Sequence, residues 1–250
     1  LAVLLILTAH CAIIGRMKRI TPKHLIRLKK AMIFFAVAML LNTGLVTLTQ
    51  LTASTPKIVD ENGKIPENSI AELIKLELNG RRQWISLRGR DKNAPVLLFL
   101  AGGPGGTQMA AVRHVLAELE KHFVVVNWDQ PGSGKSYYAE KIKNITAQTY
   151  IQDGYALTEY LKNRFSQEKI YLMGESWGSA LGIFLVDRYP ESYHAFIGTG
   201  QMVDFAETER MDYAKALEIA QSKGDTALME RLHANGEPPY YGKDVTWKSA

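Results

Sequence analysis

The sequence predicts an α/β fold, in which a mostly parallel sheet is covered by helices on both faces. The first observation is that strand-like and helix-like segments alternate through the middle of the chain. Strands are expected near 95–101, 123–128, 169–174 and 194–199, and helices near 108–121, 147–165 and 177–188. Such alternation implies right-handed crossovers between parallel strands. The second observation is that 96–100 and 123–126 are almost continuously apolar, as is typical of strands buried on both faces.

A third observation places an antiparallel pair of strands at the start of the sheet. Residues 71–78 alternate with period two, which is typical of a half-buried strand. Asn79-Gly80 is a hairpin turn signal, and residues 83–87 continue as the partner strand. The segment 54–69 before this pair is polar and contains proline and glycine, so it predicts a linker. The predicted core therefore spans residues 70–203.

The segment Gly174-Glu-Ser-Trp-Gly178 joins the strand at 169–174 to a helix of small residues. A serine at a sharp strand-to-helix turn is pushed out of the sheet edge, and the flanking glycines allow the backbone to crowd there. The helix N-terminus favours negative charge beside the serine. Ser176 is therefore the candidate catalytic nucleophile, activated by a base that takes its proton. The alternative is a glycine-rich loop that happens to contain a serine.

Two further motifs follow strands that would end at the same sheet edge. The first, Leu97-Leu-Phe-Leu-Ala-Gly-Gly-Pro-Gly-Gly106, is an apolar strand that runs into a glycine-rich loop. In hydrolases with this kind of serine turn, such a loop donates one backbone N–H to the oxyanion, and the residue after the nucleophile donates the other. These donors would be Gly103, with Gly102 as its rival, and Trp177.

The second motif, Val124-Val-Val-Asn-Trp-Asp-Gln-Pro-Gly-Ser-Gly-Lys-Ser136, reads as a buried strand followed by a turn. Its Gly-Lys-Ser ending is reminiscent of a phosphate-binding loop. That motif requires a glycine where this chain has Asp129, and a carboxylate there would repel phosphate. We therefore expect no nucleotide to bind.

Together these motifs resemble the proline iminopeptidase branch of the α/β-hydrolases, over residues 70 to 200. That branch shows H-G-G-P-G, D-Q-R-G-x-G-x-S and G-x-S-W-G-x-x-L in this order. The chain departs from it at Ala101, which replaces a histidine that braces the oxyanion loop, and at Pro131, which replaces an arginine that holds the turn. Neither change affects the nucleophile.

The resemblance implies an α/β-hydrolase fold with a helical cap inserted after the sixth strand. Helical segments at 205–222 and 226–233 fit such a cap, which would be partial and span 204–250; a helical pair away from the substrate is the alternative. In the resembled family a cap carboxylate holds the free amino terminus of the peptide. Glu207 and Glu209 are candidates by region, and Gly102 is expected to lie against the substrate.

The acid and the base of the catalytic triad are not recognisable. In this fold they follow the serine on later strands, in the order Asp or Glu, then His. His194 follows Ser176 but lies at a strand start. His233, with Asp225 before it, is therefore the candidate in this order, but a spacing of eight residues suits two turns of one helix. We therefore expect both triad partners beyond residue 250.

The resemblance implies a serine hydrolase that forms an acyl-enzyme and acts on short peptides as an aminopeptidase. An esterase or lipase for small lipophilic esters is the alternative in the same fold. A catalytically inactive binding domain is the alternative of another class, motivated by Ala101 and Pro131. No cluster of His, Cys and carboxylates has the spacing of metal ligands, so neither metal nor cofactor is expected.

The formal net charge of +5 over 250 residues does not indicate a nucleic-acid partner, because the positive charge is local. Seven of the 30 basic residues lie in 16–30, and 1–53 contains no Asp or Glu. The remaining 23 basic and 25 acidic residues give the rest of the chain a slightly negative charge.

The basic segment 16–30 separates two apolar segments, 1–15 and 31–53. The 19 uncharged residues from 31 to 49 are long enough to span a bilayer as a helix. Because basic loops stay in the cytoplasm, we expect a transmembrane helix over 31–53 and a hydrolase domain outside the cytoplasm. A cleaved signal peptide and the end of a larger membrane domain are the alternatives. Cys11, the only cysteine, is expected to be a small buried apolar residue.

Overall fold

The computed structural model describes residues 21–240. It divides into two compact units, Leu1–Ser54 and Thr55–Ala250, and each is described here by itself. The predicted apolar segment 1–15, with Cys11, lies outside the described residues, as do the beginning of the basic segment and the last ten residues.

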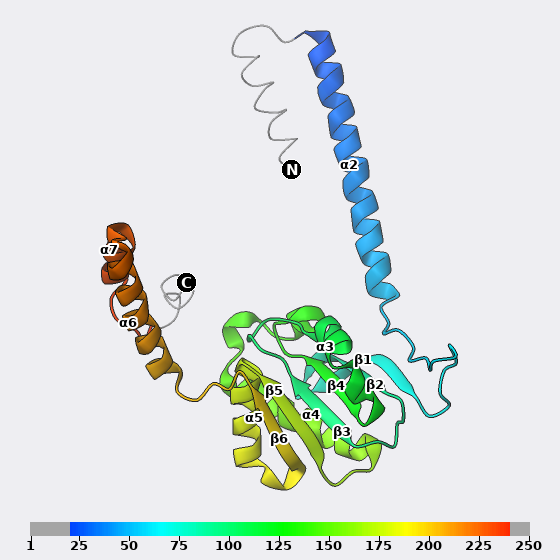
Figure 1. Ribbon diagram of the computed structural model, residues 1–250. Coiled ribbons are helices and arrows are strands. Elements are labelled where there is room, and N and C mark those ends of the chain that lie inside the picture. Colours follow the sequence, from blue (N-terminus) through cyan, green and yellow to red (C-terminus); the bar gives the residue numbers. More distant parts are fainter. Residues whose placement is uncertain (1–20, 241–250) are drawn as a thin grey trace. The chain divides into compact units, whose positions relative to one another are not determined.

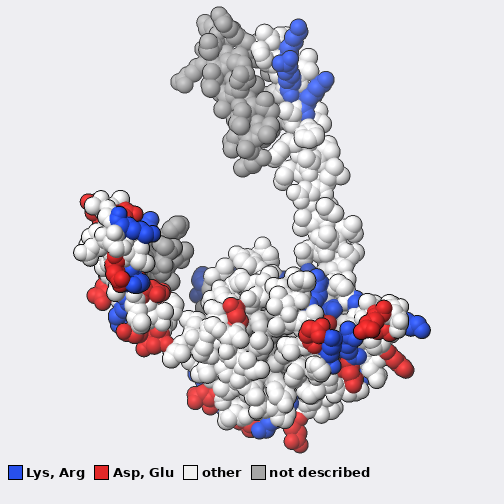
Figure 2. Space-filling view, in the orientation of Figure 1, with Lys and Arg blue, Asp and Glu red and all other residues white. Residues whose placement is uncertain are grey.

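The first unit contains helix α2 (Pro22–Leu51), whose side chains are all at least partly exposed. The helix begins at Pro22, so the basic segment expected as a loop is helical from that residue on. Proline suits the first helical position because the amide it lacks would have no partner there. Figure 2 shows the basic side chains at the start of α2 and uncharged residues along the rest.

Helix α2 has 30 residues and a mean hydropathy of 2.1 over its most apolar window. Within the described residues it is the one helix that is long and apolar enough to cross a membrane. Signal sequences near an N-terminus meet the same criterion, so one such helix is weak support for a membrane span.

The second unit is built on a six-stranded sheet with strand order β1-β2-β4-β3-β5-β6 (Figure 1). The strands are β1 (Ile70–Leu78), β2 (Arg81–Gly89), β3 (Val96–Leu100), β4 (Val124–Asp129), β5 (Ile170–Glu175) and β6 (Tyr193–Thr199). The predicted hairpin is confirmed, since β1 pairs antiparallel with β2, and β2 continues antiparallel to β4. The last four strands are mutually parallel, so β3, β4 and β5 end at one edge.

Helices cover both faces of this sheet, as the alternation predicted. They are α3 (Met109–Val115), α4 (Ala147–Phe165) and α5 (Trp177–Arg188). Alternate residues of β4 belong to two separate apolar cores: Val124 and Val126 join the larger core under α4 and α5, whereas Val125 joins a smaller core with Val112 of α3. This alternation follows from side chains pointing to opposite faces of a strand. The helix predicted at 108–121 is shorter than expected, because a 3-10 turn (Ala117–Lys121) follows α3.

Two helices follow β6, namely α6 (Phe205–Lys223) and α7 (Thr226–Asn235). Each is capped by an aspartate: Asp204 accepts the N–H of Glu207 at 2.9 Å, and Asp225 accepts that of Leu228 at 2.9 Å. Gly224 ends α6 in the left-handed conformation that glycine adopts without strain. The helical pair was predicted, and its role as a cap stays a prediction.

The predicted linker 54–69 is attached to the second unit at its start. The buried Arg88 side chain on β2 donates to Glu120 at 2.7 Å and to the Thr55 hydroxyl at 2.7 Å. It also donates to the Pro56 carbonyl, and Ile58 is buried two residues later. The beginning of the linker is therefore part of the folded domain.

Candidate active site

Ser176 occupies a strained turn between β5 and α5. Its φ of 53° and ψ of −120° lie in a region that residues with a side chain rarely adopt. The turn is held from both sides: the Ser176 N–H donates to the Thr199 carbonyl at 3.0 Å, and the Ser176 carbonyl accepts from the Ser179 N–H at 2.8 Å. Strain held by surrounding hydrogen bonds is a feature of functional sites.

Glycines on either side of the turn allow α5 to approach the sheet closely. A Cβ atom at Gly174 would clash with the backbone of Gly178, and one at Gly178 would clash with the Leu100 carbonyl. Backbone cannot move aside as a flexible side chain can. The two glycines of the motif are therefore required by packing, which fixes the direction in which Ser176 leaves the strand.

The rival donors Gly102 and Gly103 differ in whether the backbone N–H already has a hydrogen-bond acceptor. The Gly102 N–H donates to Gln108 Oε1 at 3.0 Å. Within residues 21–240, no acceptor is recorded for the N–H groups of Gly103 and Trp177. Gly103 has a φ of 124°, which glycine adopts without a steric penalty. The hydrogen bonds thus favour Gly103 over Gly102 as the partner of Trp177.

Two glutamines, which the sequence reasoning missed, brace the glycine-rich loop after β3 against the serine turn. Gln108 Nε2 donates to Glu175 Oε2 at 2.8 Å, while its Oε1 accepts from Gly102. Gln130 Nε2 donates to the Ala101 carbonyl at 3.1 Å, and its Oε1 accepts from the Trp177 indole at 3.1 Å. Bracing expected from a histidine at 101 is here performed by side chains at 108 and 130. The available signal was the position of Gln130 directly after β4 and of Gln108 directly before α3.

The Asp129 carboxylate holds the turn after β4. In the resembled family an arginine also holds this turn, at the position of Pro131 in this chain. The Asp129 carboxylate accepts from the Thr107 hydroxyl at 2.5 Å and from the Lys135 N–H at 2.7 Å. Burial raises the pKa of Asp129, and these two hydrogen bonds oppose that effect. The carboxylate occupies the inside of the turn, next to Gly134, where a phosphate-binding loop would need open amides.

No base for Ser176 is found in the described part of the chain, where no histidine hydrogen-bonds to it. His194 lies on β6 with its ring 5.0 Å from that of Tyr171, and His233 lies in the last turn of α7. Across residues 21–240 there is also no group of three or more His, Cys, Asp or Glu that could hold a metal ion.

Of the two cap candidates, Glu207 is exposed and Glu209 is partly buried. Glu207, in the first turn of α6, forms an ion pair with Arg210 at 3.1 Å. Glu209 lies two residues further along the same helix, and neither glutamate side chain forms a hydrogen bond or ion pair with a predicted site residue among residues 21–240.

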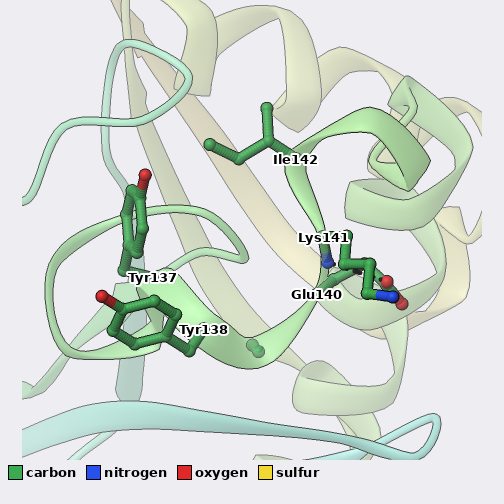
Figure 3. A pocket seen from close by; sticks show the side chains of 6 residues that line it. Tyr137, Tyr138, Glu140, Lys141 and Ile142 are labelled. Carbon is green, nitrogen blue, oxygen red and sulfur yellow. Dashed lines mark hydrogen bonds between the residues drawn. The ribbon is translucent and has the colours of Figure 1, made fainter.

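A depression of about 500 Å³ lies on the segment after β4 (Figure 3). It is lined by Tyr137, Tyr138, Ala139, Glu140, Lys141 and Ile142, none of which was predicted as a site residue. The Tyr137 and Tyr138 rings meet edge to face at 5.0 Å. Because the depression lacks the serine and the oxyanion loop, it is distinct from the candidate active site.

Comparisons with known proteins find relatives that are described as peptidases. YbaC of Bacillus subtilis, described as a probable aminopeptidase, is 38% identical over 179 residues, which cover 70% of this chain and 56% of that protein. The proline iminopeptidase of Lactobacillus crispatus is 31% identical over 126 residues, which cover 49% of this chain and 41% of that protein. The chain thus spans about half the length of the curated relatives it matches.

The fold is also found in a crystal structure of a proline iminopeptidase-related protein from Thermus thermophilus. The TM-score is 0.51 at 24% identity, over 59% of this chain and 50% of that one. The model of the family described as serine aminopeptidase, S33, matches residues 92–239. Since this match includes the glycine-rich loop after β3, the serine turn and more than half of the sequence, the chain belongs to the S33 serine aminopeptidase family and has an α/β-hydrolase fold.

Proposed function

We propose that the protein is a serine aminopeptidase that cleaves short peptides through an acyl-enzyme. The observation that carries the proposal is Ser176, a non-glycine residue held at positive φ between a parallel strand and a helix. The N–H groups of Gly103 and Trp177, which have no acceptor within the described residues, support it, because an oxyanion site needs donors that are not already used.

In the proposed reaction, the Ser176 hydroxyl oxygen bonds to the carbonyl carbon of the substrate as its proton passes to a base. The carbonyl oxygen becomes an oxyanion that accepts from Gly103 and Trp177, and one such donor contributes about 2.7–4 kcal/mol to catalysis. The C–N bond then breaks and the amine leaves with the proton. Water hydrolyses the acyl-enzyme and restores the serine.

The peptide substrate is supported by the relatives, which are described as an aminopeptidase and a proline iminopeptidase. Glu207 and Glu209 stay candidates for binding the peptide amino terminus, with Gly102 next to the reacting carbonyl. An esterase acting on small lipophilic esters would use the same nucleophile and oxyanion donors. A comparison of substrates is therefore needed to distinguish the aminopeptidase from the esterase.

A fluorophosphonate probe added to the full-length protein tests the mechanism. We expect the probe to phosphonylate Ser176, and peptide mapping by mass spectrometry should find it there and not on Ser179, whose hydroxyl donates to the Ser176 carbonyl. Aminoacyl amides and short-chain esters are then compared as substrates. Failure of the folded full-length protein to react would overturn the mechanism and favour a binding domain. Turnover of esters that lack an α-amino group, together with no turnover of aminoacyl amides, would favour the esterase.

We further propose that α2 anchors the protein in a membrane, with the hydrolase domain outside the cytoplasm. After alkaline carbonate washing, we expect the full-length protein to stay in the membrane pellet. Protease added to intact cells should degrade the hydrolase domain. A shorter, soluble protein that lacks α2 would instead identify a cleaved signal sequence. Protection from protease despite membrane retention would reverse the proposed orientation.

A further inference from the structure

Glu175, which directly precedes the nucleophile, has its carboxylate next to the oxyanion loop. The position that a Cβ atom at Gly102 would occupy is 2.6 Å from Glu175 Oε2 and 3.3 Å from Ser176 Cβ. Glu175 Oε2 and Ser176 Cβ therefore both lie close to Gly102, on the loop that is expected to contact the reacting carbonyl. The Glu175 side chain is partly buried.

This carboxylate has a neutral hydrogen-bond donor but, within the described residues, no cationic partner. Gln108 Nε2 donates to it at 2.8 Å. The orientation of the Gln108 amide follows from its neighbours, since the Gly102 N–H can only donate and must face the amide oxygen. Among the salt bridges formed within residues 21–240, none includes Glu175.

An uncompensated carboxylate at this place opposes the chemistry proposed for Ser176. The transition state places negative charge on the substrate oxygen, and a second negative charge a few ångströms away raises its energy. A cation bound between the two would reverse this effect. The described side chains provide no such cation, so the substrate is the natural source of one.

We propose that Glu175 binds the α-ammonium group of the amino-terminal residue of the peptide. The inference rests on the proposed function, because only an aminopeptidase attacks the carbonyl next to a free amine. Standard bond lengths put that nitrogen about 2.5 Å from the carbonyl carbon. A carboxylate beside Ser176 is therefore within reach of the ammonium when the carbonyl is at the serine. Glu175 then acts as a specificity residue, and Gln108 positions it.

The test compares an aminoacyl substrate with its analogue that lacks the α-amino group, in wild type and in Glu175→Gln. The glutamine oxygen can still accept from Gln108, so the variant removes the charge and keeps the brace. We expect kcat/KM for the aminoacyl substrate to fall about 10- to 100-fold, the range for a hydrogen bond to a charged group. We expect turnover of the analogue to stay the same or to rise.

Two further variants separate recognition from positioning. Gln108→Leu leaves the charge but removes the brace, and we expect it to slow both substrates by the same factor. Glu218→Gln, which changes an exposed carboxylate paired with Lys215 on α6, should alter neither rate. If Glu175→Gln does not fold, as judged by its circular dichroism spectrum, Glu175→Ala is compared with Gln108→Leu, because both lose the brace and only Glu175→Ala also loses the charge.

Failure of this inference differs from failure of the proposed function. If the probe labels Ser176 in wild type and in Glu175→Gln, but the two proteins discriminate equally between the substrates, Glu175 does not bind the ammonium. A selective loss in Glu207→Gln instead would assign recognition to α6 and overturn the inference in the same way. Absence of labelling in wild type overturns the proposed function itself.

Discussion

Ser176→Gly is expected to abolish hydrolysis and to make the protein more stable. The serine has φ 53° and ψ −120°, which glycine adopts freely and other residues adopt at a cost of about 1–3 kcal/mol. Removing the side chain therefore releases strain and at the same time removes the nucleophile. We expect kcat/KM to fall at least about 1,000-fold and the free energy of unfolding to rise by about 1 kcal/mol or more.

Two companion variants show whether strain is the cause. Ser176→Ala removes the hydroxyl but keeps a Cβ atom, so it should lose activity without the gain in stability. Ser166→Gly relieves a positive φ of 52° at the end of α4 and should stabilise the protein while activity stays normal. Unfolding in denaturant and steady-state kinetics measure both properties. Equal stability of the Gly and Ala variants at 176 would show that the turn stores no usable strain.

The strand-to-helix turn at Ser176 could be predicted from the sequence, whereas the role of Ser176 as the nucleophile stays a prediction. A serine between two glycines at the end of an apolar strand is locally unfavourable, and a local exception of this kind indicates function. The alternation of strands and helices was predictable for a different reason, since it depends on periodicity within short segments. The serine motif and the periodicity can both be recognised within a short run of consecutive residues.

The braces of the oxyanion loop could not be predicted, because they join residues that are far apart in sequence. Gln130 contacts Trp177 and Ala101 only after β4 and β5 have taken their places beside β3. The departure at Ala101 suggested a weakened loop, and the fold compensates through side chains from two other segments. Likewise, the charge of Glu175, which no described cation pairs, becomes visible only when the surroundings of the serine are known.

A second long-range network holds the hairpin that begins the sheet. Asp153 of α4 is completely buried and accepts four hydrogen bonds from the β1–β2 hairpin. Arg81 donates two of them, at 2.8 and 2.5 Å, while Asn79 and Gln83 donate one each at 2.8 and 2.7 Å. The hydrogen bond to Asp153 raises the pKa of Arg81, while burial opposes this effect. Gln83 in turn accepts from the buried indole of Trp128 at 2.8 Å.

Asp153→Ala is accordingly expected to lower the free energy of unfolding by about 3–5 kcal/mol, because a partly buried guanidinium and two amides lose their acceptor together. Thermal unfolding followed by circular dichroism measures the loss. Glu72→Ala is the matched control, since it breaks a more exposed pair with Arg164 and should cost less than about 1 kcal/mol. Adding Arg81→Leu to Asp153→Ala should restore part of the stability, because it removes the guanidinium that has lost its acceptor. If the double variant is no more stable than Asp153→Ala, the loss comes from the packing of α4 and not from the charge.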